Sequence, residues 1–237
     1  MTDLNSVPGT ESVPGTEFRV LHDLPGDPQS NMDRDEELSR QVFAGAAPPT
    51  LRIYGWNRPA VSVGRRQAVE GLLAEIGTRY IVPGTDLRSL PVVRRLTGGG
   101  AVVHRTDELT YAIAVPRSSL TVPGTLGYPV PISKIPGLIH RDLRAELVHR
   151  GLASSEEMLV AGSDSKGPFT LCFSAPVCGD LVHQGVKVAG SAMRVWKGGL
   201  LIQGSIQALP VAPDALGDAL AAVVTRTFQG DGCAGLP

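Results

Sequence analysis

The sequence of 237 residues predicts an α+β fold in which helices flank a mixed sheet. Short segments with alternating apolar and polar residues, the pattern of half-buried strands, dominate the middle of the chain. Segments with apolar residues at helical spacing lie before, between and after them. The hydrophobic content of 42% and the chain length suffice for one globular domain with its own core.

Three segments have helical periodicity: 30–45, 136–151 and 213–228. In the first, Ser30 followed by Asp33 is a helix-start pattern, so the helix is predicted to begin there. In the second, Pro136 suits the first turn, and Gly151 suits the position just after the last turn.

Strands are predicted wherever apolar residues alternate between turn signals. The expected strands are TLRIYGW (50–56), AVSVG (60–64), LTYAIAVP (109–116) and a short apolar strand around Cys172. The segments KVAGSAMRVW (187–196) and LLIQGSIQAL (200–209) flank a Lys-Gly-Gly turn, which predicts a β-hairpin over residues 186–206.

Composition excludes several classes of function. A formal net charge of −1 gives no electrostatic basis for binding nucleic acid or an anionic membrane. No apolar run approaches the roughly 18 residues of a membrane helix, and the first 17 residues lack the charged and apolar regions expected of a secretion signal. The three cysteines, Cys172, Cys178 and Cys233, fit neither a disulfide framework nor a zinc site, so we expect no metal and a cytoplasmic location.

The tetrapeptide VPGT occurs four times, at residues 7–10, 13–16, 82–85 and 122–125. Pro-Gly marks turns, and four residues at irregular intervals cannot form a repeat unit, so these copies are interpreted as loop insertions. Residues 1–17 are then expected to be disordered, and residues 18–237 to form a single domain.

Three motifs could carry chemistry. In TGGG (97–100) the glycines are typical of a bend, or of backbone N–H groups that face a carbonyl or phosphate oxygen with Arg94 or Arg95 nearby. Lys187 lies within an apolar strand, either as a surface lysine at the edge or as a functional one. Cys172 alone is more often an inert small hydrophobe, and His104 alone a structural histidine.

Read together, five segments in fixed order resemble the lipoate–protein ligase and octanoyltransferase family. They are NMDRDEEL, PPTLRIYGWNRPAVSVGRRQ, VVRRLTGGGAVVHRTDELTYAIAVP, CFSAPVCGDLVHQGVKVAGSAMR and KGGLLIQGSI, and the resemblance runs from about residue 30 to about residue 208. It implies the biotin/lipoate protein ligase-like fold: one catalytic domain with a mixed, mostly antiparallel central sheet flanked by helices.

The cysteine makes the chain most similar to the octanoyltransferases, which move an octanoyl group from acyl carrier protein to a lysine of a lipoyl domain. The resemblance implies that Cys172 carries the acyl thioester and that Lys187, 15 residues later, activates the thiol. The acceptor would be a lipoyl-domain protein such as the glycine-cleavage H protein or a dehydrogenase E2. No cofactor is expected, because a thioester donor is already activated. The residues predicted to line the substrate site are Arg95, Thr97, Gly98, Gly99, Gly100, Ala101, His104, Gly190, Ser191 and Ala192.

Two alternatives remain open. Gly100 stands where the transferase branch commonly has arginine, and glycine there resembles the ATP-using lipoate ligases. An ATP-dependent lipoate–protein ligase, which would need ATP and Mg²⁺, is therefore the second hypothesis. The third is a non-catalytic acyl- or lipoyl-domain-binding protein, which would not need the thiol–lysine pair that this sequence retains.

Overall fold

The computed structural model describes residues 18–72, 74, 89–120, 131–163 and 171–229. All four VPGT copies, residues 1–17 and Cys233 lie outside these ranges, so the predictions made for them remain predictions.

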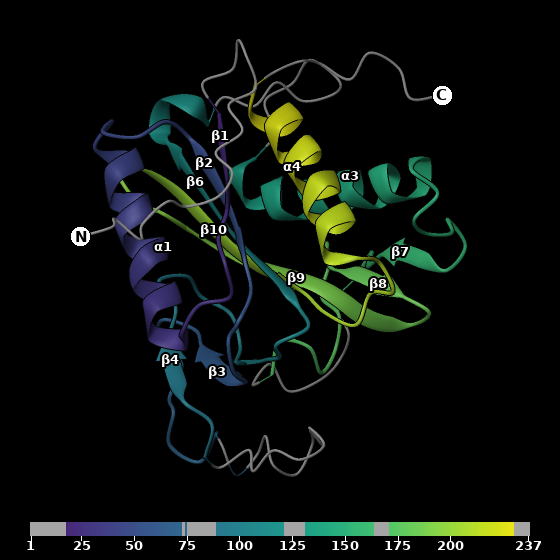
Figure 1. Cartoon of the computed structure of the whole chain (residues 1–237), viewed down its shortest axis with the longest axis horizontal. Coiled ribbons are helices and arrows are strands. Elements are labelled where there is room, and N and C mark those ends of the chain that lie inside the picture. The colour runs from purple at the N-terminus through teal and green to yellow at the C-terminus, as the bar shows by residue number, and fades with distance from the viewer. Residues whose placement is uncertain (1–17, 73, 75–88, 121–130, 164–170, 230–237) are drawn as a thin grey trace, which may run out of the picture.

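A sheet of seven strands, here called the main sheet, forms the centre of the molecule (Figure 1). Only β1 and β2 run parallel; every other neighbouring pair in this sheet is antiparallel. The predicted mixed, mostly antiparallel sheet is thereby confirmed. Its strands, in spatial order, are β1 (Arg19–His22), β2 (Thr50–Tyr54), β6 (Leu109–Pro116), β10 (Gly199–Ile206), β9 (Val186–Val195), β8 (Leu181–His183) and β7 (Met158–Val160).

The predicted hairpin over residues 186–206 is confirmed as β9 and β10. Its register pairs Leu200 with Val195 and Gly204 with Ser191. On its other side β10 pairs with β6, where Gly204 lies opposite Tyr111. A Cβ at Gly204 would lie 2.2 Å from the Tyr111 ring, so the absence of a side chain there makes room for the tyrosine.

A second, three-stranded sheet, the small sheet, was not expected from the sequence. It consists of β3 (Ala60–Val63) between β4 (Val92–Arg94), which is parallel to it, and β5 (Val102–His104), which is antiparallel. The strand predicted at 60–64 therefore belongs to a separate sheet. The glycine run 98–100 lies between the end of β4 and the start of β5.

The helix α1 (Pro28–Phe43) begins two residues earlier than predicted. Asp27 caps it by accepting the Gln29 N–H at 3.1 Å, and Pro28 occupies the first turn, so Ser30 is already inside the helix. The other predicted helices are confirmed as α3 (Ile135–His149) and α4 (Pro213–Gln229). Gly151 follows the end of α3 with φ +68°, a conformation that favours glycine. Of the helices described, none combines the length and apolar composition needed to span a bilayer.

The helices cover opposite faces of the main sheet (Figure 1). Side chains such as Leu51 and Ile113 share one apolar cluster with α3 and α4. Successive side chains of a strand point to opposite faces of the sheet. Ala112 and Leu201 point to the other face, where they pack with α1 in a second apolar cluster. On the α1 side β10 also presents Gln203 in a polar stretch, and the candidate site lies over that stretch.

Candidate active site

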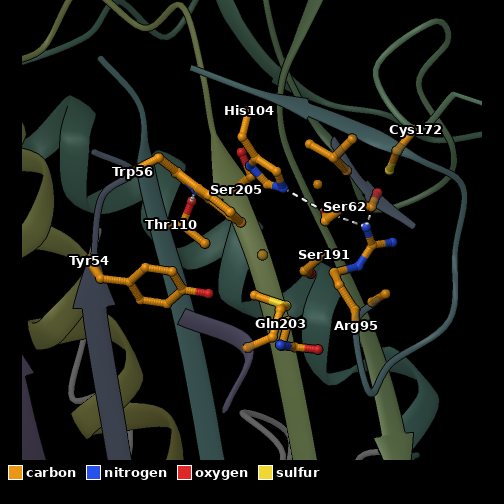
Figure 2. A pocket seen from close by; sticks show the side chains of 15 residues that line it. Tyr54, Trp56, Ser62, Arg95, His104, Thr110, Cys172, Ser191, Gln203 and Ser205 are labelled. Carbon is orange, nitrogen blue, oxygen red and sulfur yellow. Dashed lines mark hydrogen bonds between the residues drawn. The ribbon is translucent and has the colours of Figure 1, made fainter. Parts of the chain in front are cut away.

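A pocket opens on the α1 side of the main sheet, between that sheet and the small sheet (Figure 2). The empty space in and around it, including the part open to solvent, is about 390 Å³. Six residues predicted for the site line it: Arg95, His104, Cys172, Gly190, Ser191 and Ala192.

Cys172 and Lys187 meet at this pocket. The Lys187 Nζ lies 2.8 Å from the Cys172 carbonyl oxygen and 3.4 Å from its Sγ. Lys187 is 5% exposed, so the interpretation of it as a surface lysine at a sheet edge is wrong. The prediction of a strand around Cys172 is also wrong. Leu171 forms one isolated bridge with Ala101, and the chain then turns, with the Cys172 N–H donating to the Ala101 carbonyl at 2.8 Å.

Asp180 is a third member of this cluster that sequence reasoning missed. Its Oδ2 lies 2.6 Å from the Lys187 Nζ and also accepts the Val177 N–H at 2.7 Å. Both members of the ion pair are buried, since the exposed fraction of Asp180 is 4%. A Cβ at Gly190 would lie 2.6 Å from the Lys187 Cε, so this glycine gives the lysine its space. The Gly-Asp pair at residues 179–180, before an alternating strand, was the available sequence signal.

The residues Gly98, Gly99 and Gly100 form a turn, here called the glycine turn, that wraps around a buried guanidinium. One terminal nitrogen of Arg95 donates to the carbonyl oxygens of Gly98 at 3.0 Å and Gly100 at 2.8 Å. The other donates to the backbone oxygen of Ser62 at 2.8 Å and to its hydroxyl at 2.7 Å. Gly99 has φ +86°, which favours glycine, so the bend interpretation of this motif is correct.

Burial lowers the pKa of Arg95, while Cys172 and then Tyr54 act in the opposite direction. Arg95 is 8% exposed, and its hydrogen bonds in the described residues go to neutral oxygens. The guanidinium is thus held by dipoles rather than by a carboxylate.

His104 is a buried histidine with both ring nitrogens bonded. Its Nδ1 lies 2.6 Å from a Glu108 carboxylate oxygen, and its Nε2 lies 2.6 Å from the Ser62 hydroxyl (Figure 2). Because the His104 Nδ1 donates to the Glu108 carboxylate, the Nε2 of the neutral ring accepts, and we assign the Ser62 hydroxyl proton to it. The ring stacks on Trp56 at 3.8 Å between centroids. The structural interpretation of His104 fits these contacts, although the ring also lines the pocket.

Thr97 lies behind the pocket rather than in its lining. It is fully buried, and both its N–H and its hydroxyl face the Gln203 Oε1, at 3.3 and 3.0 Å. The Gln203 amide nitrogen donates in turn to Asp35 at 2.7 Å. Burial raises the pKa of Asp35, and the nearby Arg52 guanidinium opposes that effect. Thr97 therefore connects the glycine turn to the polar interior beneath α1.

Tyr111 of β6 and His140 of α3 form another buried contact, on the α3 side of the main sheet. The Tyr111 hydroxyl lies 3.1 Å from the His140 Nε2, and the His140 Nδ1 lies 2.7 Å from the Gly179 carbonyl oxygen. Burial lowers the pKa of His140, which favours the neutral ring. This contact fixes the backbone next to Asp180.

No cluster of three or more histidine, cysteine or carboxylate side chains suited to a metal ion occurs in the described part of the chain. The groups in and beside the pocket are the Cys172 thiol, the Lys187 ammonium and the Arg95 guanidinium.

Two family models match the chain. The model of the lipoyl protein ligase A/B catalytic domain matches residues 27–128, and that of the biotin/lipoate A/B protein ligase family matches residues 82–209. The chain belongs to the biotin/lipoate A/B protein ligase family. The family predicted from the five ordered motifs is thereby confirmed.

Curated relatives include an octanoyltransferase LipM of Oceanobacillus iheyensis, 34% identical over 195 residues, and one of Geobacillus kaustophilus, 38% identical over 184 residues. The alignments cover 80% and 76% of this chain, and 63% and 61% of those proteins. The chain thus spans a little under two thirds of the length of these relatives.

Among solved structures, lipoate-protein ligase A bound with ATP superimposes with a TM-score of 0.61 at 18% identity, covering 90% of this chain and 85% of the other. The putative lipoate protein ligase Ta0514 from T. acidophilum gives a TM-score of 0.64 at 19% identity, covering 90% and 86%. These similarities confirm the biotin/lipoate protein ligase-like fold.

Proposed function

We propose that this chain is an octanoyltransferase that moves an octanoyl group from acyl carrier protein, through a thioester on Cys172, to a lysine of a lipoyl domain. The observation that carries the proposal is the buried Lys187 Nζ, 3.4 Å from the Sγ of Cys172, a residue that lines the pocket. The names of the curated relatives support the same reaction.

In the first step the Cys172 thiolate attacks the carbonyl carbon of the octanoyl thioester. The bond from that carbon to the donor sulfur breaks, and the donor leaves as a thiolate that takes up a proton. Lys187 serves this step by donating a hydrogen bond to the Cys172 Sγ, which favours the thiolate over the thiol. One thioester replaces another, so no ATP is required.

In the second step the neutral amine of the acceptor lysine attacks the Cys172 thioester. The carbon–nitrogen bond of the amide forms, the carbon–sulfur bond breaks, and the amine nitrogen releases a proton. Cys172 leaves as a thiolate and again accepts a hydrogen bond from Lys187. Amide formation from a thioester is downhill, so this step also proceeds without a nucleotide.

The glycine turn supplies a place for the substrate carbonyl. The carbonyl oxygens of Gly98 and Gly100 point to Arg95, and no acceptor for the N–H groups of Gly99 and Gly100 lies among the described residues. Such N–H groups can stabilise negative charge that develops on a carbonyl oxygen. We assign the octanoyl tail to the pocket that Arg95 lines next to this turn, where Met32 and Trp56 are among the lining side chains.

The test is incubation of the protein with octanoyl-acyl carrier protein and a lipoyl domain, without ATP. We expect an octanoyl mass on the protein, then on the lipoyl domain, and loss of both in C172S. Absence of the adduct and of transfer, with a folded protein, would contradict the proposal. A lipoyl domain whose target lysine is replaced by arginine is the control for transfer to that residue.

A second candidate, an ATP-dependent lipoate ligase, is favoured by Gly100. That enzyme would bind ATP with Mg²⁺ and activate free lipoate or octanoate before transfer. Pyrophosphate release from ATP with a free acid, together with activity that survives C172S, would support the ligase instead. A protein that binds acyl groups or lipoyl domains without catalysis would give neither the adduct nor pyrophosphate.

A further inference from the structure

Cys172 and Arg95 line the pocket, and two further charged groups lie beside the thiol, since Lys187 contacts the Cys172 Sγ and Asp180 contacts Lys187. The Lys187 ammonium forms an ion pair at 2.6 Å with Asp180, and both side chains are buried. Together these two groups carry no net charge. A neutral pair can donate a hydrogen bond to a thiolate, but its field falls off much faster than that of a single charge.

The geometry of Lys187 is that of a fixed donor. An ammonium has three N–H groups, and the Nζ has three partners: the Asp180 Oδ2, the Cys172 carbonyl oxygen and the Cys172 Sγ. Gly190 closes the remaining side, because a Cβ there would lie 2.8 Å from the Nζ. Asp180 is fixed as well, since its Oδ2 also accepts the Val177 N–H.

Arg95 differs from Lys187 because it forms no ion pair with a carboxylate among the described residues. Its partners are the carbonyl oxygens of Ser62, Gly98 and Gly100 and the Ser62 hydroxyl. Two consecutive backbone carbonyls connect Arg95 to Cys172. Arg95 donates to the Gly100 carbonyl, and the carbonyl of the next residue, Ala101, accepts the Cys172 N–H. Arg95 and Cys172 line the same pocket (Figure 2).

The other ionisable groups near the pocket do not supply this charge. Burial keeps the pKa of Tyr54 well above its ordinary value, so its hydroxyl is neutral. Burial lowers the pKa of His140 on α3, which favours its neutral form. Glu108 is separated from Arg95 by His104 and Ser62, which bridge them through hydrogen bonds. The charge of Asp35 is paired with Arg52 at 2.7 Å.

We propose that Arg95 supplies the uncompensated positive charge that stabilises the Cys172 thiolate, whereas Asp180 neutralises Lys187 and holds it as a positioned hydrogen-bond donor. The catalytic role of these charges rests on the proposed function, but their effect on the Cys172 thiol can be measured without acyl transfer. In these terms Lys187 is the catalytic residue in contact with the sulfur, and Arg95 and Asp180 are positioning residues.

The experiment measures the rate of iodoacetamide alkylation of Cys172 against pH, followed by intact mass. The background is C178S/C233S, so that one of the three cysteines remains. In R95Q we expect the midpoint of the profile to rise by about one pH unit or more, a tenfold loss of thiolate at neutral pH. R95K keeps the charge while losing most of the fork of hydrogen bonds, so its midpoint should stay within about half a unit.

The deciding variant is D180N, which removes the negative charge beside Lys187 and keeps the hydrogen bond from the lysine to the sulfur. If Asp180 neutralises the ammonium, D180N leaves Lys187 as a second uncompensated positive charge, and the midpoint should fall by about one unit or more. In contrast, K187M leaves the Asp180 carboxylate unpaired and removes the hydrogen bond, so it should raise the midpoint. A D180N midpoint equal to or above that of the parent would overturn the inference, as would an R95Q profile equal to that of the parent.

Should R95Q lack a cooperative melting transition, the profile of D180N decides the question alone, since a fall shows that Asp180 neutralises Lys187 in the parent and no change refutes the inference. Failure of the proposed function has a different signature. A parent protein that acquires no octanoyl group would refute the transferase, while the alkylation profiles would still report which residue supplies the charge.

Discussion

The G190A substitution separates the position of Lys187 from its charge. A Cβ at residue 190 would lie 2.6 Å from the Lys187 Cε and 2.8 Å from its Nζ, whereas ordinary contact begins at 3.4 Å. The clashing atoms are the end of a flexible side chain, so the lysine moves and the strand stays. A displacement of well under 1 Å is enough to disturb the 3.4 Å contact with the Cys172 Sγ and the 2.6 Å contact with Asp180.

A hydrogen bond to a charged group contributes about 1.5–3 kcal/mol. Because about 1.4 kcal/mol corresponds to a factor of ten, self-acylation of G190A by octanoyl-acyl carrier protein should slow by about tenfold to a hundredfold. The melting temperature should change by less than about 4 °C, the effect of roughly 1 kcal/mol in a chain of this length. Rates come from intact mass after rapid quenching, and melting from circular dichroism.

The matched control is G162A, because a Cβ at Gly162 has no atom within 4 Å and its φ is not positive. G162A should acylate at the rate of the unchanged protein. Wild-type acylation by G190A would refute the reasoning, since it would show that the position of Lys187 does not matter. A fall of about ten degrees in melting temperature would also refute it, because the strand rather than the lysine would then have yielded.

Three further predictions concern the thiols, acid stability and packing. C172S should abolish the covalent octanoyl adduct in intact mass spectra while C178S keeps it, and an adduct found on Cys178 would overturn the assignment. Burial lowers the pKa of His140, so the unfolded chain takes up a proton that the folded chain does not. The free energy of unfolding should therefore decline as pH falls below about 6.5. Urea titrations above and below that pH should show a smaller decline for H140Q than for the unchanged protein. An equal decline in the two proteins would contradict this prediction. In G204A a Cβ would lie 2.2 Å from the buried Tyr111 ring, and the free energy of unfolding from urea titration should fall by about 1–3 kcal/mol. A stability equal to that of the unchanged protein would show that the ring has room to move.

Local pattern predicted the strands β2, β6, β9 and β10 of the main sheet but not the short strands β1, β7 and β8. The alternation in 109–116 and 200–206 places one set of side chains against α3 and α4 and the other against α1, and both strands form as predicted. The boundary of α1 was missed because Ser30 offered a cap signal as good as that of Asp27.

The strand at 60–64 was predicted, but its membership of a second sheet was not. Pairing of β3 with β4 and β5 joins Val61 to Val92 and to Val103, residues that are distant from it along the chain. Nothing in the period of a strand identifies its neighbours, so periodicity could not separate the two sheets.

The sequence by itself determined the family, through five motifs in order, and with it the pairing of Cys172 with Lys187. A bend at the run of glycines was one of two interpretations that the sequence left open, since glycine adopts a positive φ without steric cost. Only the tertiary structure decided that the bend closes on Arg95 and that Lys187 is already paired with Asp180. The physical reason is that an ion pair or a buried guanidinium depends on distances between separate elements, which the packing of the two sheets sets and no local spacing encodes.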